Sequence, residues 1–144
     1  MEASGSQEIA NLDEFQAWIE RFQKTLKGDE LILLSGEMGA GKTEFVKRLS
    51  RLYGIPETAS PTFALHHAMA SSQVRIDHFD LYRLESVDEL ETVGLWEILE
   101  DRALALIEWP ERVPEEYWPL NRTKIQLRLV LRGGTARHLS WRRF

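Results

Sequence analysis

One short stretch constrains this chain more than any other. The run Gly36-Glu37-Met38-Gly39-Ala40-Gly41-Lys42-Thr43 has the spacing G-x-x-x-x-G-K-[ST]. It follows the apolar residues 31–34 and precedes apolar positions three or four residues apart up to Tyr53, so it joins a buried strand to a helix. The glycines let successive backbone N–H groups surround an anion, and the helix start adds the positive end of its dipole. The pattern predicts a phosphate-binding loop in an α/β fold.

The residue types in the loop indicate a nucleotide as ligand. Lys42 can reach the β and γ phosphates as a point charge, and the Thr43 hydroxyl can ligate Mg²⁺. The backbone of the loop supplies the other expected ATP-binding positions, namely Gly36, Glu37, Met38, Gly39, Ala40 and Gly41. The N-K-x-D sequence of guanine-specific GTPases is absent downstream, which leaves ATP as the expected nucleotide.

Two carboxylates stand where a metal-binding acid is expected. Phosphoryl transfer needs such an acid and a group that positions the attacking oxygen. Glu108 ends an apolar strand over residues 103–107, so it should emerge at the same sheet edge as the loop, which favours a metal-site role. Asp80 ends an alternating strand from Val74, and spacing alone leaves a metal-site role and a solvated strand end equally open.

Other candidates are ambiguous from spacing. Thr62, in Ser60-Pro61-Thr62-Phe63, suits either a turn before a strand or a sensor of the γ-phosphate. Arg132, beside a Gly-Gly turn, suits either a solvated cation or the adenine side of a nucleotide. The histidines show no metal-ligand spacing and Trp109 is explained by packing, so neither receives a chemical role here.

The remaining pattern predicts one P-loop ATPase domain over residues 11–144, after a flexible segment over residues 1–10. Asn11 should cap a helix over residues 12–26, and residues 86–101 should form two short helices broken at Gly94, with Ser86 and Glu89 as a capping box. Two hairpins are expected, over residues 62–81 and 125–142. The predicted fold is a P-loop NTPase-like three-layer α/β sandwich, with a small mixed sheet, helices on both faces and a C-terminal β-hairpin.

Composition narrows the class of protein and its surroundings. A chain of 144 residues can bury a real core without disulfides or structural metal, and it contains no cysteine. No apolar run approaches a membrane span and no signal peptide is recognisable, so we expect a cytoplasmic protein. The net charge of −5 is divided unevenly, because residues 121–144 hold seven Lys and Arg and no acid, which leaves −12 for the rest.

Four segments in this order resemble one family, the TsaE (YjeE) ATPases of bacterial tRNA threonylcarbamoyl-adenosine synthesis. They are the loop from Gly36 to Thr43, Ser60-Pro61-Thr62-Phe63, His78-Phe79-Asp80-Leu81-Tyr82-Arg83 and Ile107-Glu108-Trp109-Pro110-Glu111. Many families share the first segment, so the specificity of the resemblance comes from the other three.

The resemblance implies a domain that binds ATP and Mg²⁺, hydrolyses ATP weakly alone, and works with the TsaB and TsaD proteins on tRNA. It further implies that Thr43 and Glu108 hold Mg²⁺, that Asp80 joins the metal site or orients water, and that Thr62 responds to the γ-phosphate. Lys42, Asp80 and Glu108 are the catalytic residues expected on this basis.

Two other functions stay open from the sequence. A small-molecule or nucleotide kinase shares the loop but needs an acceptor pocket and commonly an arginine-bearing lid, and between residues 86 and 102 only Arg102 is basic. A nucleotide-switched binding module would hold tRNA or protein on the basic C-terminal hairpin, where Lys124, Arg128 and Arg132 alternate with leucines and should face solvent.

Overall fold

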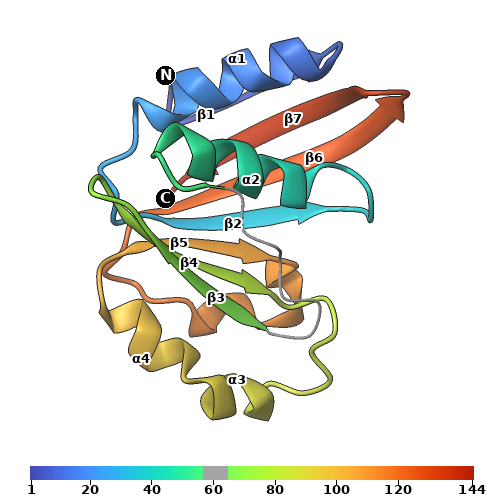
Figure 1. Ribbon diagram of the computed structural model, residues 1–144. Coiled ribbons are helices and arrows are strands. Elements are labelled where there is room, and N and C mark those ends of the chain that lie inside the picture. Colours follow the sequence, from blue (N-terminus) through green and yellow to red (C-terminus); the bar gives the residue numbers. More distant parts are fainter. Residues whose placement is uncertain (57–64) are drawn as a thin grey trace.

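A seven-stranded mixed sheet forms the centre of the molecule (Figure 1). The computed structural model describes residues 1–56 and 65–144. The strands are β1 (Ser4–Ile9), β2 (Leu31–Gly36), β3 (His66–Ala70), β4 (Arg75–Asp80), β5 (Leu104–Glu108), β6 (Lys124–Gly133) and β7 (Ala136–Arg143), in the order β1-β7-β6-β2-β5-β4-β3. The central strands β6, β2, β5 and β4 are parallel, and antiparallel partners flank them on both sides. The predicted mixed sheet and C-terminal hairpin are confirmed.

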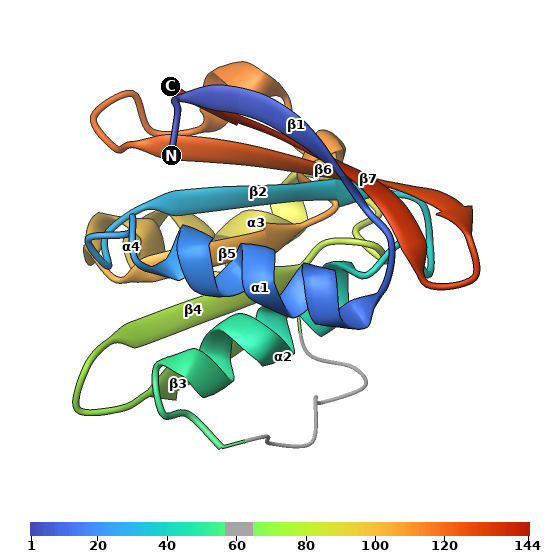
Figure 2. The same cartoon turned by 90° about the horizontal axis from the view of Figure 1, so that it is seen from above.

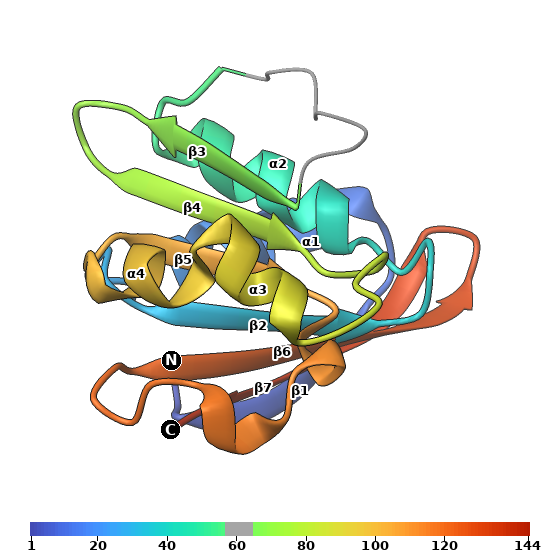
Figure 3. The ribbon, with the colours of Figure 1, turned by 90° about the horizontal axis from the view of Figure 1, so that it is seen from below.

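Helices cover both faces of this sheet and make the predicted three layers. The helices α1 (Leu12–Gln23) and α2 (Lys42–Leu52) lie on one face (Figure 2). The short helices α3 (Asp88–Val93) and α4 (Leu95–Glu100) lie on the other face, with the single turns η1 (Pro110–Arg112) and η2 (Glu115–Tyr117) (Figure 3). The helices in the described part of the chain all lack the length and hydrophobicity of a membrane span.

The apolar run of β2 is explained by burial on both faces of the sheet. Ile32 and Leu34 pack in the cluster that includes α1 and α2, whereas Leu31 and Leu33 pack in the cluster that includes α3 and α4. Successive side chains of a strand alternate between faces, so a strand covered on both sides has no polar positions. This arrangement holds β2 rigidly in the middle of the molecule, immediately before the glycine-rich loop.

Local signals placed the helix ends with two corrections. The helix predicted over residues 12–26 ends at Gln23, because the Thr25 and Leu26 amides donate to the carbonyl oxygens of Phe22 and Gln23 in a tighter turn. The Asn11 side chain accepts the Glu14 amide at 2.9 Å, as expected of an N-cap, and Gly94 separates α3 from α4 with φ +73°. Ser86 makes no side-chain cap to α3, and Glu89 accepts the backbone amide of Glu85 at 3.2 Å instead. The predicted capping box is therefore wrong, although the carboxylate still caps the chain just before the helix.

The prediction of a flexible segment over residues 1–10 is also wrong. Residues 4–9 form β1, which pairs antiparallel with β7 over its whole length. Ile9 is buried, and the Trp141 ring packs so closely on Gly5 that a Cβ there would lie only 2.6 Å from it. The partner strand lies about 130 residues away in the sequence. The local pattern of these mostly polar residues therefore does not predict a strand. Residues 62–64 of the predicted first hairpin lie outside the described residues, and β3 begins at His66.

The basic C-terminal segment is not a uniform solvent-facing strip. Arg128, Arg132 and Arg142 are exposed, but Lys124, Arg122 and Arg137 are buried. The expectation that Lys124 faces solvent is therefore wrong, and its Nζ donates to the carbonyl oxygens of Pro119 and Arg122. Buried cations that donate to internal carbonyl oxygens contribute to the fold rather than to an interaction surface.

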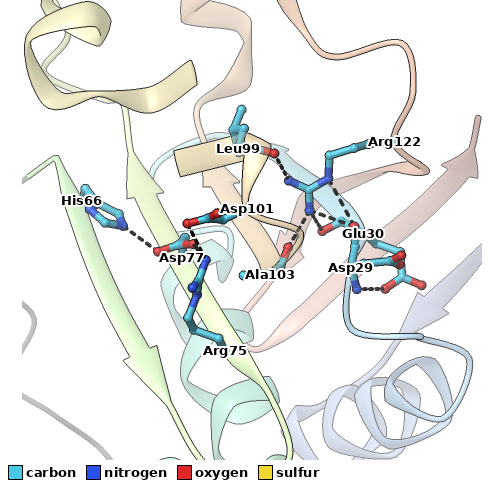
Figure 4. A network of polar contacts seen from close by, with 9 residues as sticks. All are labelled: Asp29, Glu30, His66, Arg75, Asp77, Leu99, Asp101, Ala103 and Arg122. Atoms are coloured by element: carbon cyan, nitrogen blue, oxygen red, sulfur yellow. Dashed lines mark hydrogen bonds and ion pairs between the residues drawn. The ribbon is translucent and has the colours of Figure 1, made fainter. Parts of the chain in front are cut away.

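Arg122 joins three parts of the chain that meet below the start of β2. Its guanidinium donates to the carbonyl oxygens of Asp29, Glu30, Leu99 and Ala103 (Figure 4). These carbonyls belong to the segment before β2, the end of α4 and the segment before β5. One planar cation thus ties the two central strands to the helices on the α3 and α4 face.

Candidate functional site

The glycine-rich loop lies between β2 and α2, at the edge of the sheet where the parallel strands end. Gly39 and Gly41 have φ values of +82° and +112°, which favour glycine over residues with a side chain. The Phe45 amide donates to the Gly41 carbonyl at 2.8 Å, so the first turn of α2 begins directly at the loop. The loop therefore has the left-handed turns and the helix start that the sequence predicts.

The Lys42 side chain is folded back over the loop. Its Nζ donates to the carbonyl oxygens of Gly36 and Glu37, the latter at 3.1 Å, and lies 4.0 Å from the centre of the Trp109 ring. Burial lowers the pKa of Lys42, and the negative charges of Glu108 and Glu111 partly oppose this shift. The ammonium is thus a partly desolvated cation that contacts two carbonyl dipoles and an aromatic face. A phosphate could replace these contacts, because it carries a full negative charge.

Glu108 connects the loop to the neighbouring strand β4. Its Oε1 accepts the Thr43 hydroxyl at 3.0 Å, and its Oε2 lies 2.6 Å from Nε2 of His78. The Glu108 side chain is buried at the end of its apolar strand. The carboxylate is therefore fixed at both oxygens, with one oxygen directed to the first turn of α2.

Asp80 lies beside Glu108, because the two residues are register partners across the parallel β4–β5 pair. Its Oδ1 accepts the Tyr82 amide at 3.1 Å. Although the side chain reaches the surface, partial removal from water raises the pKa of Asp80, and the negative charge of Glu108 raises it further. Two neighbouring carboxylates repel each other, so a cation between them would be favourable.

A pocket of about 360 Å³ brings these groups together. Its lining consists of Met38, Gly39, Gly41, Lys42, Thr43, Glu44, Asp80, Tyr82, Glu108 and Trp109. Trp109 closes one side of it in a left-handed conformation with φ +61°, and its ring packs against Tyr82 at 5.0 Å between centroids. The pocket has cationic, acidic and aromatic walls next to a helix N-terminus, which suits a polyphosphate with its metal ion.

The donor set also fits Mg²⁺. This ion prefers oxygen ligands and is commonly held by one or two protein groups together with phosphate oxygens. The Thr43 hydroxyl and the Glu108 carboxylate already meet at 3.0 Å, and Asp80 lies in register beside them. Across the residues described, no cluster of three or more His, Cys, Asp and Glu side chains is placed to hold a metal ion.

Four of the predicted ATP-binding residues do not line this pocket, namely Gly36, Glu37, Ala40 and Arg132. Ala40 is fully buried. Gly36 and Glu37 line a larger pocket of about 550 Å³, which Trp109 also lines. Arg132 is exposed on β6, where its Nη2 lies 3.5 Å from the Glu8 carboxylate. The predicted role of Thr62 lies outside the described residues.

Spacing alone missed two residues that contact the predicted site. His78 contacts Glu108, and Trp109 contacts Lys42, although neither residue received a chemical role from the sequence. For His78 a signal existed, since it shares one face of β4 with Asp80 two residues later. For Trp109 the left-handed backbone and the position over the lysine could not be read from spacing.

Comparisons with known sequences agree on one family. A sequence profile described as "Threonylcarbamoyl adenosine biosynthesis protein TsaE" matches residues 9–138. The chain is 35% identical over 133 residues to the tRNA threonylcarbamoyladenosine biosynthesis protein TsaE of Rickettsia bellii, covering 90% of this chain and 91% of that one. It is 36% identical to the protein of the same name from Treponema pallidum, covering 76% of this chain and 81% of that one.

A solved structure shares the fold. The crystal structure of Bacillus subtilis YdiB superposes with a TM-score of 0.76 at 23% sequence identity, covering 98% of this chain and 86% of that chain. The seven-stranded sheet with its helical layers is thus an architecture already observed in a natural protein.

Proposed function

This chain belongs to the TsaE family of tRNA threonylcarbamoyladenosine biosynthesis proteins, and on that premise we propose that it binds and hydrolyses ATP with Mg²⁺. It does so as the ATPase component of the modification machinery, with TsaB and TsaD as its protein partners. Hydrolysis drives turnover of that complex, and tRNA is reached through the partners.

A single arrangement carries the proposal. Lys42, Thr43 and Glu108 converge in one pocket although 65 residues separate the last two in the chain. Phosphoryl transfer from a nucleotide requires three such parts: a cation at the loop, a hydroxyl at the first turn of a helix and an acid at the end of the adjacent strand.

In this proposal, some residues of the pocket neutralise charge and others position the reacting groups. Lys42 would leave the Glu37 carbonyl and the Trp109 ring and direct its charge to the β and γ phosphates. Thr43 and Glu108 would hold Mg²⁺, which when bound neutralises charge on the phosphate oxygens. Asp80 would orient the attacking water by accepting its hydrogen bond. No arginine from the described residues lines the pocket, so the isolated protein should hydrolyse ATP slowly.

Phosphate release tests the activity directly. The purified protein should release inorganic phosphate from Mg·ATP without an added acceptor, and TsaB with TsaD should accelerate this release. A radiolabelled γ-phosphate that appears on a metabolite would instead make the protein a kinase and refute the proposal.

Reconstitution tests the role in the pathway. TsaB, TsaD, tRNA and a threonylcarbamoyl donor are combined with and without this protein, under single and multiple turnover. The proposal expects the protein to be dispensable for the first turnover and required for later ones. An equal requirement in both regimes would refute a role in resetting the complex.

A further inference from the structure

The C-terminal hairpin places one buried arginine beneath the phosphate loop. Arg137 on β7 is 6% exposed, and its Nη1 donates to the carbonyl oxygen of Ala40 at 3.0 Å. Its Nε and Nη2 donate to the Thr135 carbonyl, and the guanidinium lies 4.4 Å from the Phe15 ring centre. Among the described residues it forms no ion pair with a carboxylate, so the loop and the hairpin turn are its polar partners.

The bond to Ala40 fixes the direction of the next backbone amide. A trans peptide is planar, so its C=O and N–H point in opposite directions. Because Arg137 holds the Ala40 carbonyl on the β7 side, the Gly41 N–H points away from β7, and Gly41 lines the phosphate pocket. A charged donor on a carbonyl also polarises the peptide and strengthens its N–H as a donor.

The packing around Gly41 leaves this peptide little freedom. A Cβ at Gly41 would collide with the Arg137 guanidinium, so the arginine packs directly on the loop backbone. Burial lowers the pKa of Arg137, and nearby Arg48 lowers it further, yet arginine titrates so high that the group stays charged. A permanent positive charge thus sits behind the loop, where it adds to the positive end of the α2 dipole.

We propose that Arg137 is a positioning residue for phosphate binding: it orients and polarises the Ala40–Gly41 peptide so that the Gly41 N–H donates to a phosphate oxygen. The C-terminal hairpin is then part of the nucleotide site, although its own side chains need not touch the nucleotide. This inference rests on the proposed function, because it assumes that the loop binds a nucleotide phosphate.

Three variants test it by isothermal titration with Mg·ADP and by steady-state hydrolysis of Mg·ATP. Arg137→Met should weaken Mg·ADP binding about tenfold, which corresponds to ~1.4 kcal/mol, and should leave kcat at saturating ATP within about twofold. Arg137→Lys, which keeps a charge and one donor, should recover part of the affinity. Arg128→Met, which removes an exposed arginine from the adjacent strand β6, should change neither quantity.

A spectroscopic readout separates this inference from the proposed function. The Gly41 amide signal of the ligand-free protein, seen by ¹H–¹⁵N NMR, should shift in Arg137→Lys and stay in place in Arg128→Met. A folded Arg137→Met that binds Mg·ADP as tightly as the wild type would overturn the inference, as would an unmoved Gly41 signal. If Arg137→Met does not fold, Arg137→Gln takes its place under the same criterion. Wild-type protein that binds no nucleotide would refute the proposed function instead, while the Gly41 signal still reports on Arg137.

Discussion

Replacing Arg122 with methionine should destabilise the protein by about 3 kcal/mol, for reasons that follow from its four carbonyl partners. In the variant, the Glu30 carbonyl would still accept the Ala105 amide at 3.0 Å. The Asp29 carbonyl is only partly buried and would accept a hydrogen bond from water instead. The carbonyls of Leu99 and Ala103 receive the guanidinium in buried contacts. Leaving two such buried acceptors without their charged donor costs about 1.5 kcal/mol each.

Urea and thermal unfolding, followed by circular dichroism, measure this loss. For a chain of this length a loss of 3 kcal/mol lowers Tm by roughly 10 °C. Arg128→Met is the matched control, since it removes an arginine of the same C-terminal segment that is exposed, and it should change the free energy of unfolding by less than about 0.5 kcal/mol. An Arg122→Met protein as stable as this control would refute the idea that the guanidinium ties β2 and β5 to the helices.

Further predictions concern the site and the first strand. Lys42→Ala should abolish tight Mg·ATP binding in isothermal titration, because it removes the cation of the pocket, and wild-type affinity would contradict this. Glu108→Ala should retain nucleotide but lose turnover in a phosphate-release assay, and unaltered hydrolysis would remove Glu108 from the site. Asp80→Asn should raise the Tm of the ligand-free protein at neutral pH, because the raised pKa of Asp80 means that folding disfavours its ionised form. The gain should vanish as the pH falls below about 4, where the carboxyl is protonated in both states, and a gain that persists there would contradict this cause. Deleting residues 1–9 should lower Tm by exposing the edge of β7 and the Trp141 ring, and an unchanged Tm would show that β1 contributes no stability.

The parts of the fold that the sequence predicted are those specified by neighbouring residues. The Asn11 cap, the Gly94 break and the apolar run of β2 are local patterns, and the structure confirms each of them. The loop from Gly36 to Thr43 is also local, since its glycines are needed for its own backbone. Glu108 was predictable because an acid directly after an apolar strand must emerge at the edge of the sheet.

The parts that could not be predicted depend on pairings between distant residues. β1 is a strand only because β7 offers it an edge, and Arg122 and Arg137 are buried only because distant carbonyls accept their hydrogen bonds. In the sequence these arginines look the same as the exposed Arg128. Charge counting therefore overstated the basic surface of the hairpin, since net charge carries no information about which cations are enclosed.

During synthesis the phosphate loop leaves the ribosome long before the strands that complete its surroundings. The chain emerges from its N-terminus, so residues 36–43 appear while residues 124–143 are still to be translated. At that stage β2 lacks its neighbour β6, and Arg137 is absent from beneath the loop. On the function proposed above, this nascent loop would bind ATP more weakly than the finished protein does, because its Ala40–Gly41 peptide is not yet held.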